Sequence, residues 1–197
     1  MSFLDLATGP LILASESPYK RALLEERLGL TIDVQAAHLD ESRLCDESPI
    51  AMARRLAIAK ARAIADEHPN AWVIASDQVP ALGERIFGKP GSTAAAVEQL
   101  MSLQGKPHQL ITALCLIAGD QPMQIDAVVM ELEMRPLSRH QIEAYVDLDT
   151  PLDCAGSYKF ERAGAALFSS VSGPDPTSIQ GLPLLRLCSL LQNAANR

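Results

Sequence analysis

The segment from Leu11 to Leu24 joins a short apolar run to a helix start, and this junction constrains the fold more than any other part of the sequence. Leu11 to Ala14 predicts a buried strand. Ser17 is a favourable N-cap and Pro18 suits the first helical position, so we expect a helix that begins there and stops at Gly29. The backbone N–H groups and the positive end of the helix dipole would then face the space beyond the strand. The sequence therefore predicts an α/β unit with an anion site at its junction.

Two basic residues, Lys20 and Arg21, fall in the first turn of this helix. Cations at that end oppose the helix dipole, so local helix stability does not explain them, whereas an anionic ligand would. The alternative is two solvated charges on an exposed helix face, and from these residues alone the two interpretations are equal. Ser15 and Ser17 fit a hydrogen-bonding pair and a helix cap rather than nucleophiles.

The composition limits the kind of ligand. The chain has 197 residues, of which 48% are hydrophobic, and its formal net charge is −7. The apolar content is ample for a core. An acidic chain is poorly suited to a nucleic-acid polymer, because that binding rests on many phosphate contacts by Lys and Arg. We therefore expect a small-molecule anion, held by a local cluster of cations, and no polymeric nucleic acid.

The four cysteines, Cys45, Cys115, Cys154 and Cys188, are far apart and form no C-x-x-C motif. Neither a zinc site nor a disulfide framework is indicated. No apolar stretch is long enough to span a bilayer, and residues 1–10 lack the basic start of a signal peptide. These features favour a cytoplasmic protein with reduced thiols, no membrane partner and a short N-terminal extension over residues 1–10.

Strand and helix signals alternate through the first half of the chain and then give way to a hairpin. This order predicts an α/β fold, with a mixed β-sheet flanked by helices and two lobes around a central cleft, in one domain over residues 1–197. Ser76-Asp77-Gln78 follows a predicted buried strand, where open α/β sheets bind their ligands. The other expected elements are helices over 49–65, 93–103, 138–146 and 184–193 and strands over 71–75, 109–118, 123–134 and 165–171.

Charged residues at the strand ends and in the loops indicate a metal-assisted phosphate reaction. Cations neutralise phosphates, and carboxylates hold a hard divalent ion such as Mg²⁺. Any one of these residues alone is more often a surface charge. No Walker A, G-x-G-x-x-G or G-x-S-x-G sequence supports a P-loop, dinucleotide or serine-hydrolase site. The candidate cations are Lys20, Arg21, Lys60 and Lys89, and the candidate carboxylates are Asp40, Glu41, Asp77 and Glu161.

With these residues assembled, the chain from Leu11 to about Leu191 resembles the Maf family of nucleoside triphosphate pyrophosphatases. The resemblance implies a Maf/ITPase-like fold. It also implies hydrolysis of a nucleotide between its α and β phosphates with a divalent cation, Mg²⁺ or alternatively Mn²⁺ or Co²⁺. The motifs that carry it are Leu13-Ala14-Ser15-x-Ser17-Pro18 with the following basic pair, Asp40-Glu41, Lys60-Ala61, Ser76-Asp77, Gly88-Lys89-Pro90, Ala155-Gly156-Ser157-Tyr158 and Gly181-Leu182-Pro183.

The resemblance assigns Asp77 as the proton acceptor and makes Asp77 and Glu41 the expected metal ligands. An ordinary aspartate has a pKa of about 3.9 and is a weak base near neutrality, so it would act best on a water that a metal ion has already acidified. A role for Asp77 chiefly as a metal ligand is the alternative. The side chains expected to bind the phosphates are Ser15, Lys20, Arg21, Lys60 and Lys89.

Tyr19, Gln78 and Glu161 occupy the positions that separate subfamilies in this resemblance. Members that act on thymidine and uridine triphosphates carry Arg, Thr and Gln there, whereas an aromatic residue with Gln and Glu resembles the bacterial subfamily that acts on 7-methyl-GTP. An aromatic ring can stack on the positively charged 7-methylguanine for about 0.5–2 kcal/mol. A carboxylate can accept two hydrogen bonds from guanine. In the alternative, Tyr19 packs on the sheet and Glu161 binds metal.

Other functions stay open at this point. One is a pyrophosphatase for dTTP and UTP, or for inosine or xanthosine triphosphates, which would differ only in the base pocket. Another is a nucleotide-binding regulator, because Maf relatives are also associated with arrest of septum formation. The complete acidic set weighs against pure binding. A homodimer is compatible with the sequence, which does not reveal the oligomeric state.

Overall fold

A single mixed β-sheet of seven strands runs through the computed structural model, which describes residues 9–196. The strand order is β2-β1-β3-β5-β6-β7, with β4 paired to β3. β1 pairs in parallel with β2 and β3, and the other pairs are antiparallel. The strands are β1 (Leu11–Leu13), β2 (Asp33–Val34), β3 (Trp72–Leu82), β4 (Arg85–Ile86), β5 (Pro107–Ala118), β6 (Gln124–Met134) and β7 (Phe168–Ser172).

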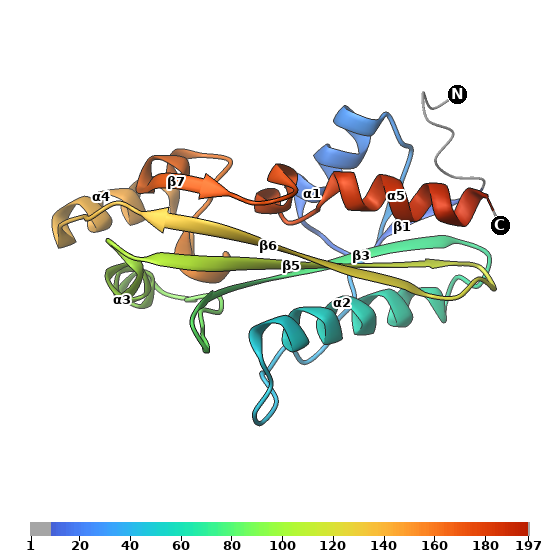
Figure 1. The fold of residues 1–197 in the computed structure, drawn as a ribbon, viewed down its shortest axis with the longest axis horizontal. Coiled ribbons are helices and arrows are strands. Elements are labelled where there is room, and N and C mark those ends of the chain that lie inside the picture. The colour runs from blue at the N-terminus through green and yellow to red at the C-terminus, as the bar shows by residue number, and fades with distance from the viewer. Residues whose placement is uncertain (1–8, 197) are drawn as a thin grey trace.

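Helices cover both faces of this sheet, so the predicted α/β fold with flanking helices is confirmed. In Figure 1, α2 lies against one face and α5 against the other, while α3 and α4 lie at the far end of the sheet. The α-helices are α1 (Pro18–Ala22), α2 (Pro49–Ala65), α3 (Thr93–Leu103), α4 (Arg139–Asp149) and α5 (Leu184–Ala195). A π-helical turn η1 (Leu23–Arg27) extends α1, and the 3₁₀ turns are η2 (Ala155–Ser157), η3 (Ala163–Leu167) and η4 (Pro176–Gln180).

Alternate residues of the central strands supply two different cores. Leu13 and Ile74 pack with the α5 side, whereas Ile12 and Val73 pack with the α2 side. Both faces are therefore apolar, which explains why these strands read as continuous hydrophobic runs. On α2 the buried face consists largely of small residues, Ala53, Ala57 and Ala61, so this helix can lie close to the sheet.

A further core fills the other end of the sheet, between α3, α4 and the ends of β5, β6 and β7. His108 is only 2% exposed there, with its ring centroid 5.9 Å from the centroids of both Tyr158 and Phe168. His108 therefore belongs to this core and not to the cleft described below. Apolar cores thus cover both ends of the sheet. The middle of the sheet, between these cores, carries the polar residues described below.

The middle strand is longer than the sequence predicts. A strand was expected over 71–75 with Ser76-Asp77-Gln78 at its end, but β3 continues to Leu82, and these three residues lie within it, paired with β5. The expectation failed because β1 ends at Leu13, opposite Ile74, while antiparallel pairing with β5 goes on. Beyond Ile74, one edge of β3 is therefore released from β1.

Pro80 is tolerated inside this strand because its missing N–H does not belong to the β5 ladder. Its carbonyl accepts a hydrogen bond from Phe87 N at 3.0 Å on the β4 side, so its nitrogen also faces away from β5. The strand expected over 165–171 is likewise displaced, since residues 163–167 form the 3₁₀ turn η3 and β7 begins only at Phe168. Helix α4 reaches Asp149, three residues beyond the predicted end at 146.

Most of the predicted N-terminal extension, 1–10, lies outside the described residues. Pro10, which is described, is fastened to the sheet through a hydrogen bond from Trp72 N to its carbonyl at 2.8 Å. Among residues 9–196, no helix is long and apolar enough to cross a membrane.

The turn between η2 and β7 depends on a glycine. Gly164 N donates to Asp149 Oδ2 at 3.2 Å, and a Cβ at Gly164 would overlap the Lys159 carbonyl, with its carbon only 2.7 Å away. We predict that Gly164→Ala lowers the free energy of unfolding by about 1–3 kcal/mol, the usual cost of overpacking. Urea unfolding measures this.

The matched control is Gly88→Ala, because a Cβ at Gly88 would meet no heavy atom within 4 Å. An equal loss of stability in both variants would show that glycine flexibility, not the close contact at Lys159, sets the cost.

Candidate active site

A cleft of about 830 Å³ opens where β1 ends. Its walls are the β1–α1 junction, the segment 36–41, one side of α2, the middle of β3, the segment 86–89, parts of 153–161, and residues 179–181. Because β1 stops at Leu13, residues from both faces of β3 reach this one space. The lining omits Arg21 and Asp40 but includes nine of the eleven candidate site residues, namely Ser15, Tyr19, Lys20, Glu41, Lys60, Asp77, Gln78, Lys89 and Glu161.

The junction after β1 forms as its sequence predicts. Ser17 caps the helix, with its side chain accepting from Lys20 N at 3.4 Å, and Pro18 is the first helical residue. Ser15 Oγ accepts from Ser17 N at 3.2 Å, so the two hydroxyls form a local pair. Gly29, with a φ of +64°, follows the end of η1. The predicted cap and the predicted stop are both confirmed.

Lys20 points into the cleft from this junction. Its Nζ donates to the Ser76 carbonyl at 3.0 Å. Burial lowers the pKa of Lys20 to about 8, against the opposing pull of the Asp77 charge. Gly181, in the turn after η4, lies directly against the lysine stem, since a Cβ there would come within 2.7 Å of Lys20 Cε. The Ser76 hydroxyl in turn donates to the Gly181 carbonyl at 2.7 Å.

On the opposite face of β3, Lys60 joins two carboxylates. Its Nζ lies 2.5 Å from Asp77 Oδ1 and 2.5 Å from Glu41 Oε1. Burial raises the pKa of Asp77 above its ordinary value, against the opposing effect of the Lys60 charge. Burial acts to lower the pKa of Lys60, but Asp77 and Glu41 together raise it, so the ammonium stays charged. This ion-paired cluster is the electrostatic centre of the cleft.

Two other predicted cations differ in their placement. Lys89 Nζ is 3.7 Å from Glu41 Oε2 and its side chain is 63% exposed, so it lies at the cleft mouth. Arg21 is outside the lining, and its Nε binds Glu25 Oε2 at 2.9 Å on the exposed side of the helix. Asp40 is exposed too, where its Oδ1 accepts from Ser42 N. The sequence already contains a signal for this placement of Arg21, because Glu25 lies four positions later, one helical turn away, where it can pair with Arg21.

Two carboxylates of the cleft are the candidate ligands of a divalent ion. Glu41 and Asp77 converge on one point, where the Lys60 ammonium lies between them. Within residues 9–196, no three Asp, Glu, His or Cys side chains cluster as a complete metal cage. Mg²⁺ is usually bound through one or two carboxylates while it keeps several waters and contacts substrate phosphates. Two carboxylates are enough ligands for such a partial site, although the Lys60 ammonium lies where they converge, and they are too few for a Ca²⁺ or Zn²⁺ cage made by protein alone.

The cleft lining also includes aromatic and acidic side chains. Tyr19 and Phe160 both line it, and Glu161 follows Phe160. No ion pair involves the Glu161 carboxylate within the described part of the chain, and burial raises its pKa. A half-buried carboxylate without an ion-pair partner, in a cleft that aromatic side chains also line, suits a ligand that offers hydrogen-bond donors.

Gln78 has a second role that sequence reasoning missed. Its amide nitrogen donates to Thr112 Oγ1 at 3.2 Å and to the Ser178 and Ile179 carbonyls at 2.7 and 3.3 Å. The side chain therefore anchors η4 to the sheet as well as lining the cleft. No local pattern predicts the contact with η4, because Ser178 and Ile179 are about a hundred residues further along the chain.

Residues 10–194 match the family described as Maf-like protein. The chain belongs to the Maf family. That range contains every element of the sheet and every residue of the cleft lining. The family resemblance stated from the sequence motifs is therefore confirmed.

Curated Maf relatives resemble the chain over almost all of its length. A protein of Pseudomonas fluorescens named 7-methyl-GTP pyrophosphatase is 46% identical over 92% of this chain and 95% of its own. Proteins with the same name from Alkalilimnicola ehrlichii and Alcanivorax borkumensis are 47% and 44% identical, over 92% and 93% of both chains. The chain is thus similar to the bacterial 7-methyl-GTP pyrophosphatases.

Solved structures agree on the fold. A HAM1 protein from Coxiella burnetii has a TM-score of 0.54 at 19% identity, covering 94% of this chain and 100% of that one. The Staphylococcus aureus Ham1 protein also has a TM-score of 0.54, at 16% identity, over 93% of this chain and 98% of its own. At these identities the likeness concerns the fold alone, and it agrees with the predicted Maf/ITPase-like architecture.

The raised pKa of Glu161 has a consequence for the stability of this Maf protein. The native state holds the Glu161 proton more tightly than the unfolded chain does, so this group contributes stability near its ordinary pKa of 4.5 that is lost as the pH rises. We predict that Glu161→Gln is more stable than wild type at pH 7 and that the difference shrinks toward pH 5. Urea unfolding at both pH values measures it.

Glu26→Gln, on the exposed surface of η1, is the control and should match wild type at both pH values. Loss of stability in Glu161→Gln at pH 7 would mean instead that the carboxylate makes stabilising contacts.

Proposed function

We propose that the protein is a nucleoside triphosphate pyrophosphatase that hydrolyses the bond between the α and β phosphates and releases pyrophosphate. The observation that carries this proposal is the ion-paired Asp77 inside a cleft that also holds Lys20 and Lys89. A base beside cations is what attack on a phosphate anhydride requires. The names of the curated relatives support the same reaction.

Each charged side chain then has a separate task. Lys20 and Lys89 neutralise the phosphates and the leaving pyrophosphate. Asp77 accepts the proton of the attacking water, and Lys60 holds the Asp77 carboxylate in place at 2.5 Å. A bound divalent cation, held by Glu41 and Asp77, would add positive charge and lower the pKa of a water. Ser15 offers its hydroxyl to the phosphates at the helix start.

The substrate that we propose is 7-methyl-GTP, which would yield 7-methyl-GMP. Tyr19 supplies an aromatic face for the cationic base, and Glu161 accepts hydrogen bonds from the guanine N1–H and amino group. The absence of an ion pair to Glu161 within the described residues supports this assignment, because such a carboxylate is free to accept hydrogen bonds from a ligand. Gln78 contributes by holding the η4 wall of the same cleft.

A substrate panel tests both the reaction and the base. With Mg²⁺ and equal concentrations of 7-methyl-GTP, GTP, UTP and dTTP, we expect the highest kcat/KM for 7-methyl-GTP and pyrophosphate as the first product. A chelator should abolish the reaction, and added Mg²⁺ should restore it. Ion chromatography distinguishes pyrophosphate from orthophosphate.

Three results would contradict parts of this proposal. Equal rates on UTP and 7-methyl-GTP would remove the base assignment. Orthophosphate as the first product would place cleavage at another bond. Tight nucleotide binding without any product would favour a nucleotide-binding regulator.

Asp77→Asn tests the proton acceptor. Because an amide cannot take the proton, we expect kcat to fall by at least about a hundredfold. Asp126→Asn is the matched control, since Asp126 lies on β6 outside the cleft lining and pairs with Arg186. A thermal melt confirms that both variants fold. Retained activity in folded Asp77→Asn would remove Asp77 from the mechanism.

A further inference from the structure

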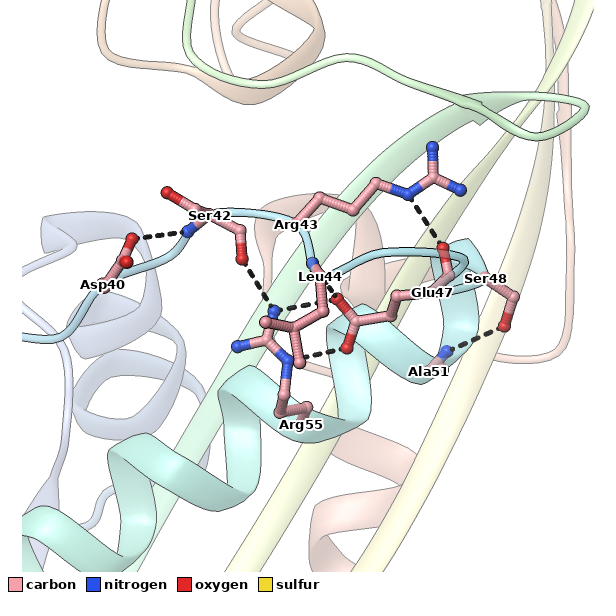
Figure 2. Close-up of polar contacts among 8 residues, drawn as sticks. All are labelled: Asp40, Ser42, Arg43, Leu44, Glu47, Ser48, Ala51 and Arg55. Carbon is pink, nitrogen blue, oxygen red and sulfur yellow. Dashed lines mark hydrogen bonds and ion pairs between the residues drawn. The ribbon is translucent and has the colours of Figure 1, made fainter.

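The segment that carries Glu41 to the cleft has no helix or strand between residues 40 and 48. It is ordered instead by side-chain contacts to α2, which Figure 2 shows around Arg55 and Glu47. We propose that Arg55 and Glu47 are positioning residues that hold Glu41 against Lys60. This inference rests on the proposed function, because it gives those two residues a part in the work of Glu41.

The Arg55–Glu47 contact is bidentate. Arg55 Nε donates to Glu47 Oε1 at 2.6 Å, and Nη2 donates to Glu47 Oε2 at 2.9 Å. The Glu47 side chain is only 8% exposed and that of Arg55 28%. A planar guanidinium matches a carboxylate in this geometry, and partial burial protects the pair from the screening that weakens surface ion pairs.

The same pair also binds the backbone next to Glu41. Arg55 Nη2 donates to the Ser42 carbonyl at 3.0 Å, and Glu47 Oε2 accepts from Leu44 N at 3.2 Å. On the other side of Glu41, Asp40 Oδ1 accepts from Ser42 N at 2.9 Å. The peptide groups at residue 42 are thus held from two directions (Figure 2).

Arg43 fastens the segment at a further point. Its Nε donates to the Glu47 carbonyl at 2.8 Å, and its Nη1 donates to the Glu84 carbonyl, at the β3–β4 turn, at 3.1 Å. Residues 42–47 are therefore tied to α2 through Arg55 and to the sheet through Arg43. Glu41, immediately before them, has little freedom to leave the cleft.

Helix α2 links the Arg55 anchor to the ion pair of Glu41. Arg55 and Lys60 both belong to α2, so the anchor of the segment and the ion-pair partner of Glu41 are fixed on one rigid element. Neither Arg55 nor Glu47 lines the cleft, whereas Glu41 and Lys60 do. Arg55 and Glu47 are therefore set back from the cleft, and their hydrogen bonds lead to it through the segment that carries Glu41.

Amide hydrogen exchange on the protein without metal or nucleotide tests the anchor directly. We expect Arg55→Met to speed exchange of the amides in 40–47 by about tenfold, because three hydrogen bonds are lost. Arg54→Met is the matched control, since Arg54 is the exposed neighbour on the same helix and should exchange like wild type. Unchanged exchange in Arg55→Met would overturn the proposal.

A second measurement separates positioning from simple stabilisation. In Arg55→Met we expect the affinity for Mn²⁺, measured by calorimetry, to fall about tenfold and kcat to fall likewise, with KM for the nucleotide nearly unchanged. The double variant, with both Arg55→Met and Glu41→Gln, should have a kcat and a Mn²⁺ affinity no lower than those of Glu41→Gln alone. A further full tenfold loss in the double variant would mean that Arg55 acts independently of Glu41 and would overturn the proposal.

Two controls keep these outcomes distinct. If Arg55→Met does not fold in a thermal melt, Arg55→Lys is used, which keeps the charge but loses the bidentate fork, and the same order of effects is expected. If wild type hydrolyses no nucleotide, the proposed function fails, while exchange and Mn²⁺ affinity still decide whether Arg55 positions Glu41. Loss of exchange protection without any change in Mn²⁺ affinity would count against it.

Discussion

The ion pair between Lys60 and Asp77 is the interaction on which the rest of the molecule depends. A carboxylate on the central strand of a covered sheet costs several kcal/mol unless a charge partner meets it. Lys60 can provide that partner only if α2 lies close to β3 in one register. The alanine face of α2 permits the close approach. Packing and charge therefore fix the same helix position.

The end of β1 determines how the cleft is assembled. On β3, Ser76 and Gln78 face η4 while Asp77, between them, faces α2. In a fully paired sheet such neighbours would lie in separate layers. Here the strand edge is open beyond Ile74, so Lys20 from one face and Lys60 from the other approach the same carboxylate. The cleft is a gap in the sheet rather than a hollow on one face.

Some parts of the fold and of the cleft could be predicted from local sequence patterns. The Ser17 cap, the Pro18 start and the hairpin strands follow from short patterns, and the residues and the family resemblance together named nine side chains that line the cleft. The extent of β3 was missed because it depends on where β1 stops and how far β5 pairs, which are long-range facts. Arg21 was placed with the other cations although Glu25 lies one helical turn away. The Arg55–Glu47 contact gave no signal, because it depends on a segment without regular structure.

The contact between Lys20 and Gly181 also has a consequence for the order in which the cleft is completed during synthesis. Synthesis of the β1–α1 junction precedes synthesis of the turn against which Lys20 lies and of the Gly181 carbonyl that Ser76 binds. A domain generally folds as a unit. Lys20, Lys60 and Asp77 are therefore made before the turn that packs against the Lys20 stem, and the complete cleft forms only after that turn.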